Sequence, residues 1–341
     1  KATSIIALAA LVVSVSPAWA AYPVPTNYQI AAPSPELQNE EMIWVCPIDS
    51  TVVIADWRDF RLGYRQVGIG RSWILPDFWQ DSLINPSMQV YSRQSDPTLT
   101  VDRGGNFYAS VLDYQPGVGY DSSYISFYKT TDKGVTWTGP VTVEDSIGPY
   151  FEDKQFITAD RTDGPHSGNV YLAWARFSSD PVRIMFARST DGVQSFEDTL
   201  VVGYPQVDNN CGYGTFGAGQ FANPLVGADG SVYVFWIGYE VDSLGGCGLY
   251  YGLKMVKSTD GGVMFTAPTQ IRRTFGNWGV VDGDIDVYNQ AAVDVDLSSS
   301  IFAGNLYAVY ADRDTITGDY NIVSIRSEDD GATWSEPIIV N

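Results

Sequence analysis

A short motif that occurs four times along the 341-residue chain constrains its fold more than any other feature. The consensus is Ser/Thr-x-Asp-x-Gly-x-Thr-Trp/Phe, and its aspartates are Asp132, Asp191, Asp260 and Asp329. A weaker fifth copy precedes them between Arg71 and Trp79. The closing aromatic residues lie at positions 79, 137, 196, 265 and 334, so successive copies are 58, 59, 69 and 69 residues apart. Spacing this regular predicts a repeated structural unit.

The motif itself is typical of a tight turn. A short aspartate side chain can accept hydrogen bonds from backbone N–H groups of its own turn. The glycine permits a positive φ, and the aromatic residue can anchor the turn in an apolar layer. We therefore expect the four aspartates to be structural, and the motif by itself indicates a fold and no activity.

The residues around each copy predict four strands per unit. Two strand-like runs joined by a turn come first, for example residues 97–101 and 106–112. A third run leads into the motif, and a fourth follows it. The motif is then the turn between the third and fourth strands of an antiparallel sheet. Four-stranded sheets repeated in this way predict an all-β fold, the β-propeller.

The motif resembles the Asp box, or BNR repeat, of sialidases and sialidase-like propellers. The segments 168–174 and 230–236 add to this resemblance, which extends over about residues 38–341. It implies an Asp-box propeller domain at 39–341, preceded by an N-terminal extension at 21–38. Sialidases have six blades, and five Asp-box units are visible here. We expect five consecutive blades of a six-bladed propeller that is incomplete at its C-terminus; a closed five-bladed ring is the alternative.

Residues 1–20 are typical of a secretory signal peptide. Lys1 precedes a short apolar run, and an Ala-x-Ala pattern ends at Ala20. We expect cleavage there and an extracellular or periplasmic protein, with an N-terminal membrane anchor as the alternative. The run is too short for a typical spanning helix, and no later segment could span a bilayer.

Charge and residue usage exclude several functions. The 40 acidic and 20 basic side chains give a net charge of −20, which argues against nucleic-acid binding. The single histidine, His166, lies in a turn, so zinc and Ser-His-Asp chemistry are disfavoured. We expect no metal and no cofactor, and a monomer. The resemblance implies a glycan or glycoprotein as partner.

Two smaller features are also predicted. Cys211 and Cys247 lie in glycine-rich stretches of a secreted chain and could form a disulfide, whereas Cys46 should be a buried thiol. Alternating carboxylates could hold Ca²⁺, although an acidic surface loop is the stronger explanation. The three residues of that loop are Asp282, Asp284 and Asp286.

The order of the strands locates a functional face. In each unit the second strand ends, and the first strand begins, at the end of the blade opposite the Asp boxes. Asp96 and residues 152–154 precede first strands on this face, and charged residues end the second strands. Guanidinium groups there could bind a carboxylate in bidentate fashion. We predict substrate-binding roles for Arg58, Arg61, Arg176, Asp312 and Arg313, and catalytic roles for Asp59 and Glu240.

The resemblance implies a chemistry for this face. Sialidases bind the substrate carboxylate with three arginines and use a tyrosine nucleophile, a glutamate and an acid/base aspartate. Asp56 or Asp59 resembles the position of the aspartate, and Glu240 could be the glutamate, but no tyrosine matches. Residues 39–43 stand where the family usually has Arg-Ile-Pro.

We therefore predict an exo-acting glycoside hydrolase that releases or binds terminal sialic acid or a related acidic sugar. One alternative is a non-catalytic propeller of a surface protein that binds glycan or protein. The other is a structural repeat domain of a larger surface protein.

Overall fold

The structure is a computed structural model that describes residues 38–74, 78–84, 91–115, 123–145, 150–178, 180–208, 214–241, 249–275, 278–281, 285–288 and 290–341. All regular secondary structure in these ranges is β-strand, in five four-stranded antiparallel sheets and two short hairpins. The described residues contain no helix long and apolar enough to cross a membrane.

Each sheet is one blade, and its strands follow one another in sequence order. Blade 1 consists of β1 (Gln38–Val45), β2 (Val53–Asp59), β3 (Gln66–Ile74) and β4 (Phe78–Leu83). Blade 2 consists of β5 (Arg93–Val101), β6 (Phe107–Tyr114), β7 (Ser123–Thr130) and β8 (Thr138–Asp145). Blade 3 consists of β9 (Tyr150–Ala159), β10 (Val170–Ser178), β11 (Arg183–Ser189) and β12 (Leu200–Gly203).

The last two blades are each preceded by a short hairpin. Hairpin β13 (Gln206–Asp208) and β14 (Gly214–Phe216) comes before blade 4, which consists of β15 (Gln220–Val226), β16 (Val232–Val241), β17 (Leu249–Ser258) and β18 (Thr269–Thr274). Hairpin β19 (Trp278–Val281) and β20 (Ile285–Tyr288) comes before blade 5, which consists of β21 (Ala291–Val295), β22 (Leu306–Arg313), β23 (Tyr320–Ser327) and β24 (Ile338–Ile339). The two hairpins account for the longer repeat spacing in this half of the chain.

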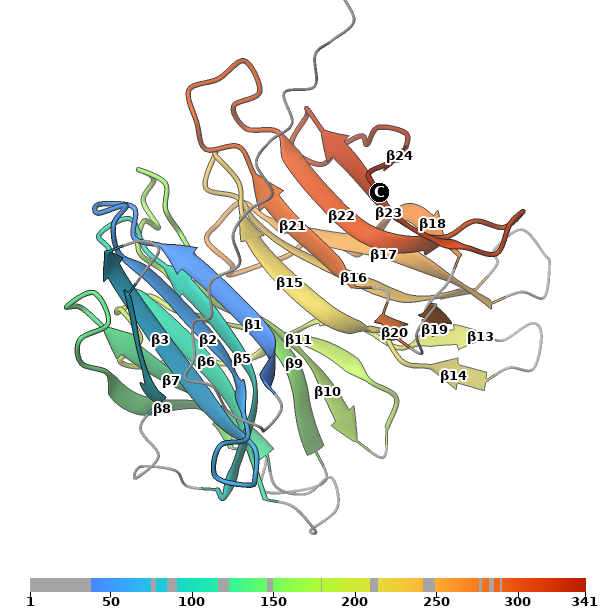
Figure 1. Ribbon diagram of the computed structural model, residues 1–341. Helices are drawn as coiled ribbons and strands as arrows, with labels where there is room; N and C mark the ends of the chain where they lie inside the picture. The colour runs from blue at the N-terminus through green and yellow to red at the C-terminus, as the bar shows by residue number, and fades with distance from the viewer. Residues whose placement is uncertain are drawn as a thin grey trace, which may run out of the picture.

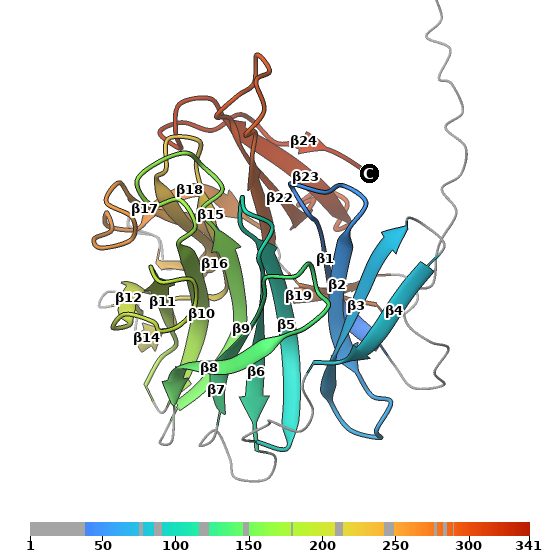
Figure 2. The ribbon, with the colours of Figure 1, turned by 90° about the vertical axis from the view of Figure 1, so that its left-hand side faces the viewer.

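The blades are arranged side by side around an axis. The first strands contact one another in succession: β1 with β5, β5 with β9, β9 with β15, and β15 with β21. Figure 1 shows the series from blade 1 in blue to blade 5 in red, and Figure 2 shows blades 1 to 3 next to one another. The predicted all-β propeller of four-stranded blades is therefore confirmed, with five blades in the described chain.

Apolar side chains between successive blades form the core. In blades 1 to 4 the second strand is buried on both faces over most of its length, as expected of a strand that is covered on each side. Residues 170–175 of β10 are all fully buried, for example. Trp236 of β16 and Phe186 of β11 belong to the core between blades 3 and 4, and Ile54 of β2 and Phe107 of β6 belong to the core between blades 1 and 2.

The four Asp-box motifs lie between the third and fourth strands of blades 2 to 5. In each, the residue four positions later donates its backbone N–H to the aspartate carboxylate, at 2.9 Å for Asp132, 3.1 Å for Asp191, 3.0 Å for Asp260 and 2.8 Å for Asp329. We call this end of the propeller the back. The opposite end, where second strands finish and first strands begin, is the front.

One cation joins three blades at the back. Arg161 is the second residue after the end of β9 in blade 3. Its guanidinium lies 4.7 Å from the ring centre of Trp44 in β1. The same guanidinium is 3.9 Å from the carboxylate of Asp294 in β21. Blades 1, 3 and 5 therefore meet around one side chain near the axis.

Several predictions fall on residues outside the described ranges. The signal peptide 1–20, nearly all of the extension 21–38, Cys211, Cys247, Asp282 and Asp284 lie there. Asp286 is an exposed residue of β20. Within the described chain Cys46 is a buried free thiol, and no three His, Cys, Asp or Glu residues are grouped as metal ligands.

Candidate functional site

The first strands of blades 1 to 4 share one backbone irregularity near their front ends. In each blade the pairing of the first strand with the second shifts register at a bulge. A non-glycine residue at this point has a positive φ: Glu40 (60°), Asp96 (49°), Lys154 (49°) and Phe221 (58°). This conformation is uncommon for residues other than glycine and is often found at functional sites.

Three of these residues meet at the axis. The Lys154 Nζ atom is 3.0 Å from Glu40 Oε1 and 3.3 Å from Asp96 Oδ1. Arg58, near the end of β2, places its Nη1 atom 3.0 Å from the same Glu40 oxygen. Together with Asp153, these residues form what we call the axial cluster: Glu40, Arg58, Asp96, Asp153 and Lys154. Blades 1, 2 and 3 all contribute to it.

Asp96 lies in the middle of the cluster and shares hydrogen bonds with both other carboxyl groups, Glu40 and Asp153. It is also the most buried of the three, with a side chain only 7% exposed. Despite this burial, the charge of Lys154 and the hydrogen bonds from its neighbours hold the pKa of Asp96 below its ordinary value. Asp96 is therefore held in its ionised form.

Burial and the negative charge of Asp96 have the opposite effect on the two outer carboxyl groups. They raise the pKa of Asp153 to about 7, although Lys154 and Gln220 oppose the shift. The Gln220 side chain donates to Asp153 Oδ2 at 2.5 Å. Burial and Asp96 also raise the pKa of Glu40, but two cations at 3.0 Å favour its charged form. Near neutral pH the cluster thus holds a proton donor beside a carboxylate, as general acid–base catalysis requires.

Asp59, predicted to be catalytic, lies elsewhere. Neighbouring residues of a strand point to opposite faces, so Asp59 and Arg58 face opposite sides of β2. Asp59 is fully buried and accepts hydrogen bonds from Trp57 Nε1 (2.8 Å) and from the backbone and side chain of Arg61 (2.8 and 2.7 Å). Against burial, these bonds lower its pKa. Asp59 is therefore an ionised partner of Arg61, which also reaches Asp81 at 2.6 Å.

Among the remaining predicted residues, Arg176 and Glu240 are paired with charged partners, whereas the buried Asp56 carboxyl group has no charged partner among the described residues. Asp56 is fully buried, and burial raises its pKa well above the ordinary range. Arg176 Nε donates to Glu152 at 2.8 Å, and Glu152 also accepts from Trp174 at 2.6 Å. Glu240 forms an ion pair with Lys254 at 2.8 Å.

Asp312 and Arg313 belong to the β22–β23 hairpin of blade 5. Asp312 accepts the backbone N–H of Phe275 at 2.6 Å, and burial raises its pKa. Arg313 is exposed and donates to the carbonyl of Gly318 at 3.1 Å. Arg58, Arg176 and Arg313 each have a different partner in the described chain: Glu40, Glu152 and the Gly318 carbonyl. Their role in binding a substrate carboxylate stays a prediction.

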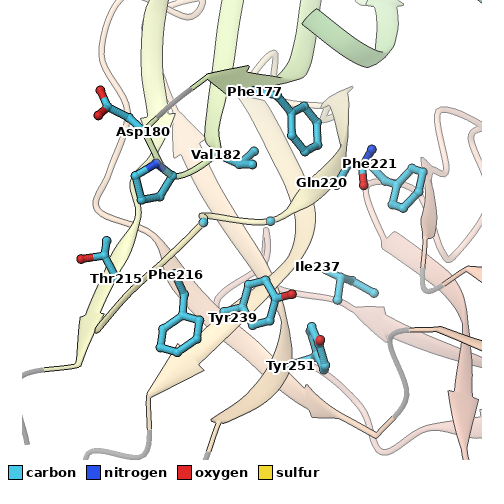
Figure 3. A pocket seen from close by; sticks show the side chains of 13 residues that line it. Phe177, Asp180, Val182, Thr215, Phe216, Gln220, Phe221, Ile237, Tyr239 and Tyr251 are labelled. Atoms are coloured by element: carbon cyan, nitrogen blue, oxygen red, sulfur yellow. The ribbon is translucent and has the colours of Figure 1, made fainter. Parts of the chain in front are cut away.

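An aromatic pocket adjoins the axial cluster. Its volume is about 610 Å³, and Gln220, the partner of Asp153, is part of its wall. The lining residues are mainly apolar: Phe177, Asp180, Pro181, Val182, Thr215, Phe216, Gly217, Gly219, Gln220, Phe221, Ile237, Tyr239 and Tyr251. Figure 3 shows Phe177 and Gln220 on one side of the pocket and Phe216 and Tyr239 on the other. The pocket is on the front of blade 4 beside blade 3.

Sequence comparison gives no relatives: no protein-family model and no curated protein matches the chain. Solved structures do resemble it. A Hadza microbial sialidase aligns with 89% of this chain and 58% of its own, at 15% identity and a TM-score of 0.56. The leech intramolecular trans-sialidase aligns with 89% of this chain and 61% of its own, at 11% identity and a TM-score of 0.59. The chain thus spans less than two thirds of either sialidase.

A third similar structure is an α-L-arabinofuranosidase of Fusarium graminearum. It aligns with 86% of this chain and 79% of its own, at 11% identity and a TM-score of 0.57. The fold is the β-propeller that these proteins share. At such low identity the likeness concerns the fold alone, so any activity has to be argued from the site.

Proposed function

We propose that the chain is a propeller glycoside hydrolase and that the axial cluster cleaves the bond to a terminal sugar. The observation that carries this proposal is the set of three carboxyl groups in which Asp96 is ionised and Asp153 has a pKa of about 7. Most glycoside hydrolases use one protonated and one ionised carboxyl group on either side of the scissile bond. The sialidase and arabinofuranosidase folds among its structural neighbours support the same class of reaction.

Asp153 is the general acid in this proposal. It gives its proton to the glycosidic oxygen as the bond from that oxygen to the anomeric carbon breaks. Asp96 is a positioning residue, because its buried negative charge keeps the proton on Asp153. Glu40 is the base: it takes a proton from a water molecule whose oxygen attacks the anomeric carbon.

The separation of the acid and base carboxyl groups determines whether the anomeric configuration is inverted or retained. Asp96 hydrogen-bonds to both Glu40 and Asp153 and so separates them. Inverting enzymes need about 6.5–9.5 Å between the two carboxyl groups to admit a water, whereas retaining enzymes have about 5 Å.

The charges of the cluster favour an uncharged sugar. Lys154 is paired with Glu40 and Asp96, and Arg58 is paired with Glu40, so neither cation is left over for the carboxylate of an acidic sugar. An arabinofuranoside, the substrate type named for one structural neighbour, is a suitable candidate. Sialic acid, predicted from the sequence, is the second candidate, since Arg58 lies at the axis.

The test is a panel of 4-nitrophenyl glycosides that includes an α-L-arabinofuranoside, neutral hexopyranosides and an α-sialoside. We expect hydrolysis of an uncharged member, with Glu40→Gln reducing kcat/KM by about 100-fold or more. Glu41→Gln, at the exposed neighbouring position of β1, is the matched control and should leave the rate unchanged. Asp153→Asn should harm a methyl glycoside more than the nitrophenyl glycoside, because nitrophenolate leaves without protonation.

Failure to cleave any member of a broad panel would reject the hydrolase and favour a glycan-binding propeller. Hydrolysis of the sialoside alone would reject the preference for uncharged sugars. If Asp153→Asn reduced the hydrolysis of the methyl glycoside and of the nitrophenyl glycoside by the same factor, Asp153 would not be the general acid.

A further inference from the structure

The aromatic pocket on blade 4 is a built feature of the fold. Counted from the first residue of each second strand, the seventh residue is charged in four blades, at Asp59, Asp113, Arg176 and Asp312. Blade 4 has Gly238 there. A Cβ atom at Gly238 would overlap the carbonyl oxygen of Ala218, so the glycine lets the segment 217–219 lie flat on the sheet.

Two hydrogen bonds fix that segment in place. Ala218 donates its N–H to the Val182 carbonyl at 2.7 Å, and its own carbonyl accepts from Trp236 Nε1 at 3.1 Å. Gly219 has a φ of 134°, and a Cβ there would overlap the Ile237 carbonyl. The floor of the pocket is thus backbone held between blades 3 and 4.

The walls of the pocket are rings. Phe216 and Tyr239 have ring centres 5.8 Å apart, and Tyr239 and Tyr251 have ring centres 4.8 Å apart. Among the described residues of the lining there is no Lys or Arg, and the one charged side chain, Asp180, is an exposed acid. Rings of this kind bind uncharged groups that have an apolar face, and the acid disfavours an anion.

We infer that this pocket receives the leaving group of the glycoside, and that the leaving group is an uncharged ring with an apolar face. This inference rests on the proposed function, because the general acid Asp153 defines the side on which the glycosidic oxygen departs. Gln220 connects that acid to the pocket, since it donates to Asp153 and also lines the cavity. The ring comes from one of two sources, a neutral sugar residue of a glycan or an aryl group.

The test measures binding, so it does not depend on hydrolysis. Two probes represent the two sources: arabinobiose, by saturation-transfer NMR, and 4-methylumbelliferone, by fluorescence polarisation. We expect at least one probe to bind the wild-type chain, and both Phe216→Ala and Tyr239→Ala to weaken it by roughly tenfold. Tyr239→Phe keeps the ring and should restore binding. Phe302→Ala removes a half-exposed ring between β21 and β22 and is the matched control.

The outcomes separate the two proposals. Binding of arabinobiose supports a sugar ring, and binding of 4-methylumbelliferone supports an aryl ring. Probe binding by the wild-type chain, together with no hydrolysis of any glycoside by that same chain, leaves the pocket assignment intact and rejects the hydrolase. The pocket assignment is overturned if neither probe binds, if the two alanine variants bind like wild type, or if free sialic acid displaces the probe.

Discussion

The back and the front of this propeller use the same repeated backbone in opposite ways. At the back, four turns repeat one residue pattern, and the same hydrogen bond from residue i+4 recurs in each. At the front, one backbone bulge recurs in four blades, yet it carries Glu40, Asp96, Lys154 and Phe221. Repetition of side chains thus belongs to the part that stabilises the blades. Their variation belongs to the part where we propose chemistry.

Carboxyl groups at the back and at the front also differ in the direction of their pKa shifts. At the back, against slight burial, hydrogen bonds from their own turns lower the pKa of Asp132 and Asp191 to about 2. At the front, burial raises the pKa of Asp153 to about 7 and that of Asp113 to about 6. The fold therefore stabilises the charged form of these carboxyl groups at the back. At the front it disfavours the charged form of Asp153 and Asp113 but favours that of Asp59 and Asp96, and pKa values shifted apart in this way are common at catalytic sites.

The sharpest way to break this comparison is to remove one carboxylate from each end. Asp153→Asn should reduce kcat/KM on a methyl glycoside by about 10²- to 10⁴-fold, because the proton donor is lost. Asp191→Asn should keep kcat/KM within about twofold at 25 °C, since its turn is remote from the axial cluster. If circular dichroism shows that both variants are folded, comparable losses of kcat/KM would contradict the assignment of catalysis to the front and stabilisation to the back.

A second change gives blade 4 the charged residue that the other blades have. Gly238→Asp should destabilise the chain by about 3 kcal/mol or more, because the side chain overlaps the Ala218 carbonyl and buries a charge. Gly230→Asp is the control, since a Cβ there meets nothing within 4 Å, although its φ is 80°. It should cost about 1 kcal/mol. Urea unfolding measures both, and a harmless Gly238→Asp would show that the pocket floor is not held as described.

A third change tests the stabilising role of the back. Asp191→Ala removes the acceptor of the Ser195 backbone N–H (3.1 Å) and hydroxyl (2.7 Å). We expect the Tm to fall by about 2–5 °C. Glu41→Ala, an exposed residue at the front end of β1, should change the Tm by less than about 1 °C. Calorimetry measures the Tm of both variants. An unchanged Tm in Asp191→Ala would show that this Asp box does not stabilise the fold.

The smallest expected effect is in the pH dependence of stability. A carboxyl group with a lowered pKa stabilises the fold above its unfolded value of 3.8, and this contribution is lost as the pH falls toward 2. A carboxyl group with a raised pKa acts in the other direction, so the contribution of Asp153 is lost as the pH rises from about 4 to about 7. Asp153→Asn should therefore raise the Tm at pH 8 and leave it nearly unchanged at pH 4. A Tm gain independent of pH would argue against the shifted pKa.

The fold could be predicted because its signals are local. Each Asp box holds the residues that form its turn within eight positions of sequence. The strand-forming segments on either side of it recur in the same order in every unit. The front could be predicted only in part. Strand order placed Arg58, Asp96 and residues 152–154 on the correct face, but it could not show which carboxyl groups would meet. Asp59 and Glu240 were assigned catalytic roles because they end second strands, and the structure instead pairs them with Arg61 and Lys254.

Glu40 was missed because of its position at a bulge. In a regular strand alternate residues share a face, and one extra residue in the bulge changes which side chains point to the axis. Nothing in the sequence near Asn39 marks that bulge, since the residue with a positive φ is not a glycine. The meeting of Glu40, Asp96 and Lys154 also requires contacts between three blades, over more than 100 residues of sequence.

The recurring bulge has a consequence for how such a site could change over time. The unusual φ is imposed by the pairing of the first and second strands, and acidic, basic and aromatic residues all occupy it in this one chain. A single codon change per blade can therefore alter the charge or shape presented at the axis, while the strands that hold the position stay as they are. Each of blades 1 to 4 offers one interchangeable position, so new specificities could arise by independent point mutations instead of loop insertions.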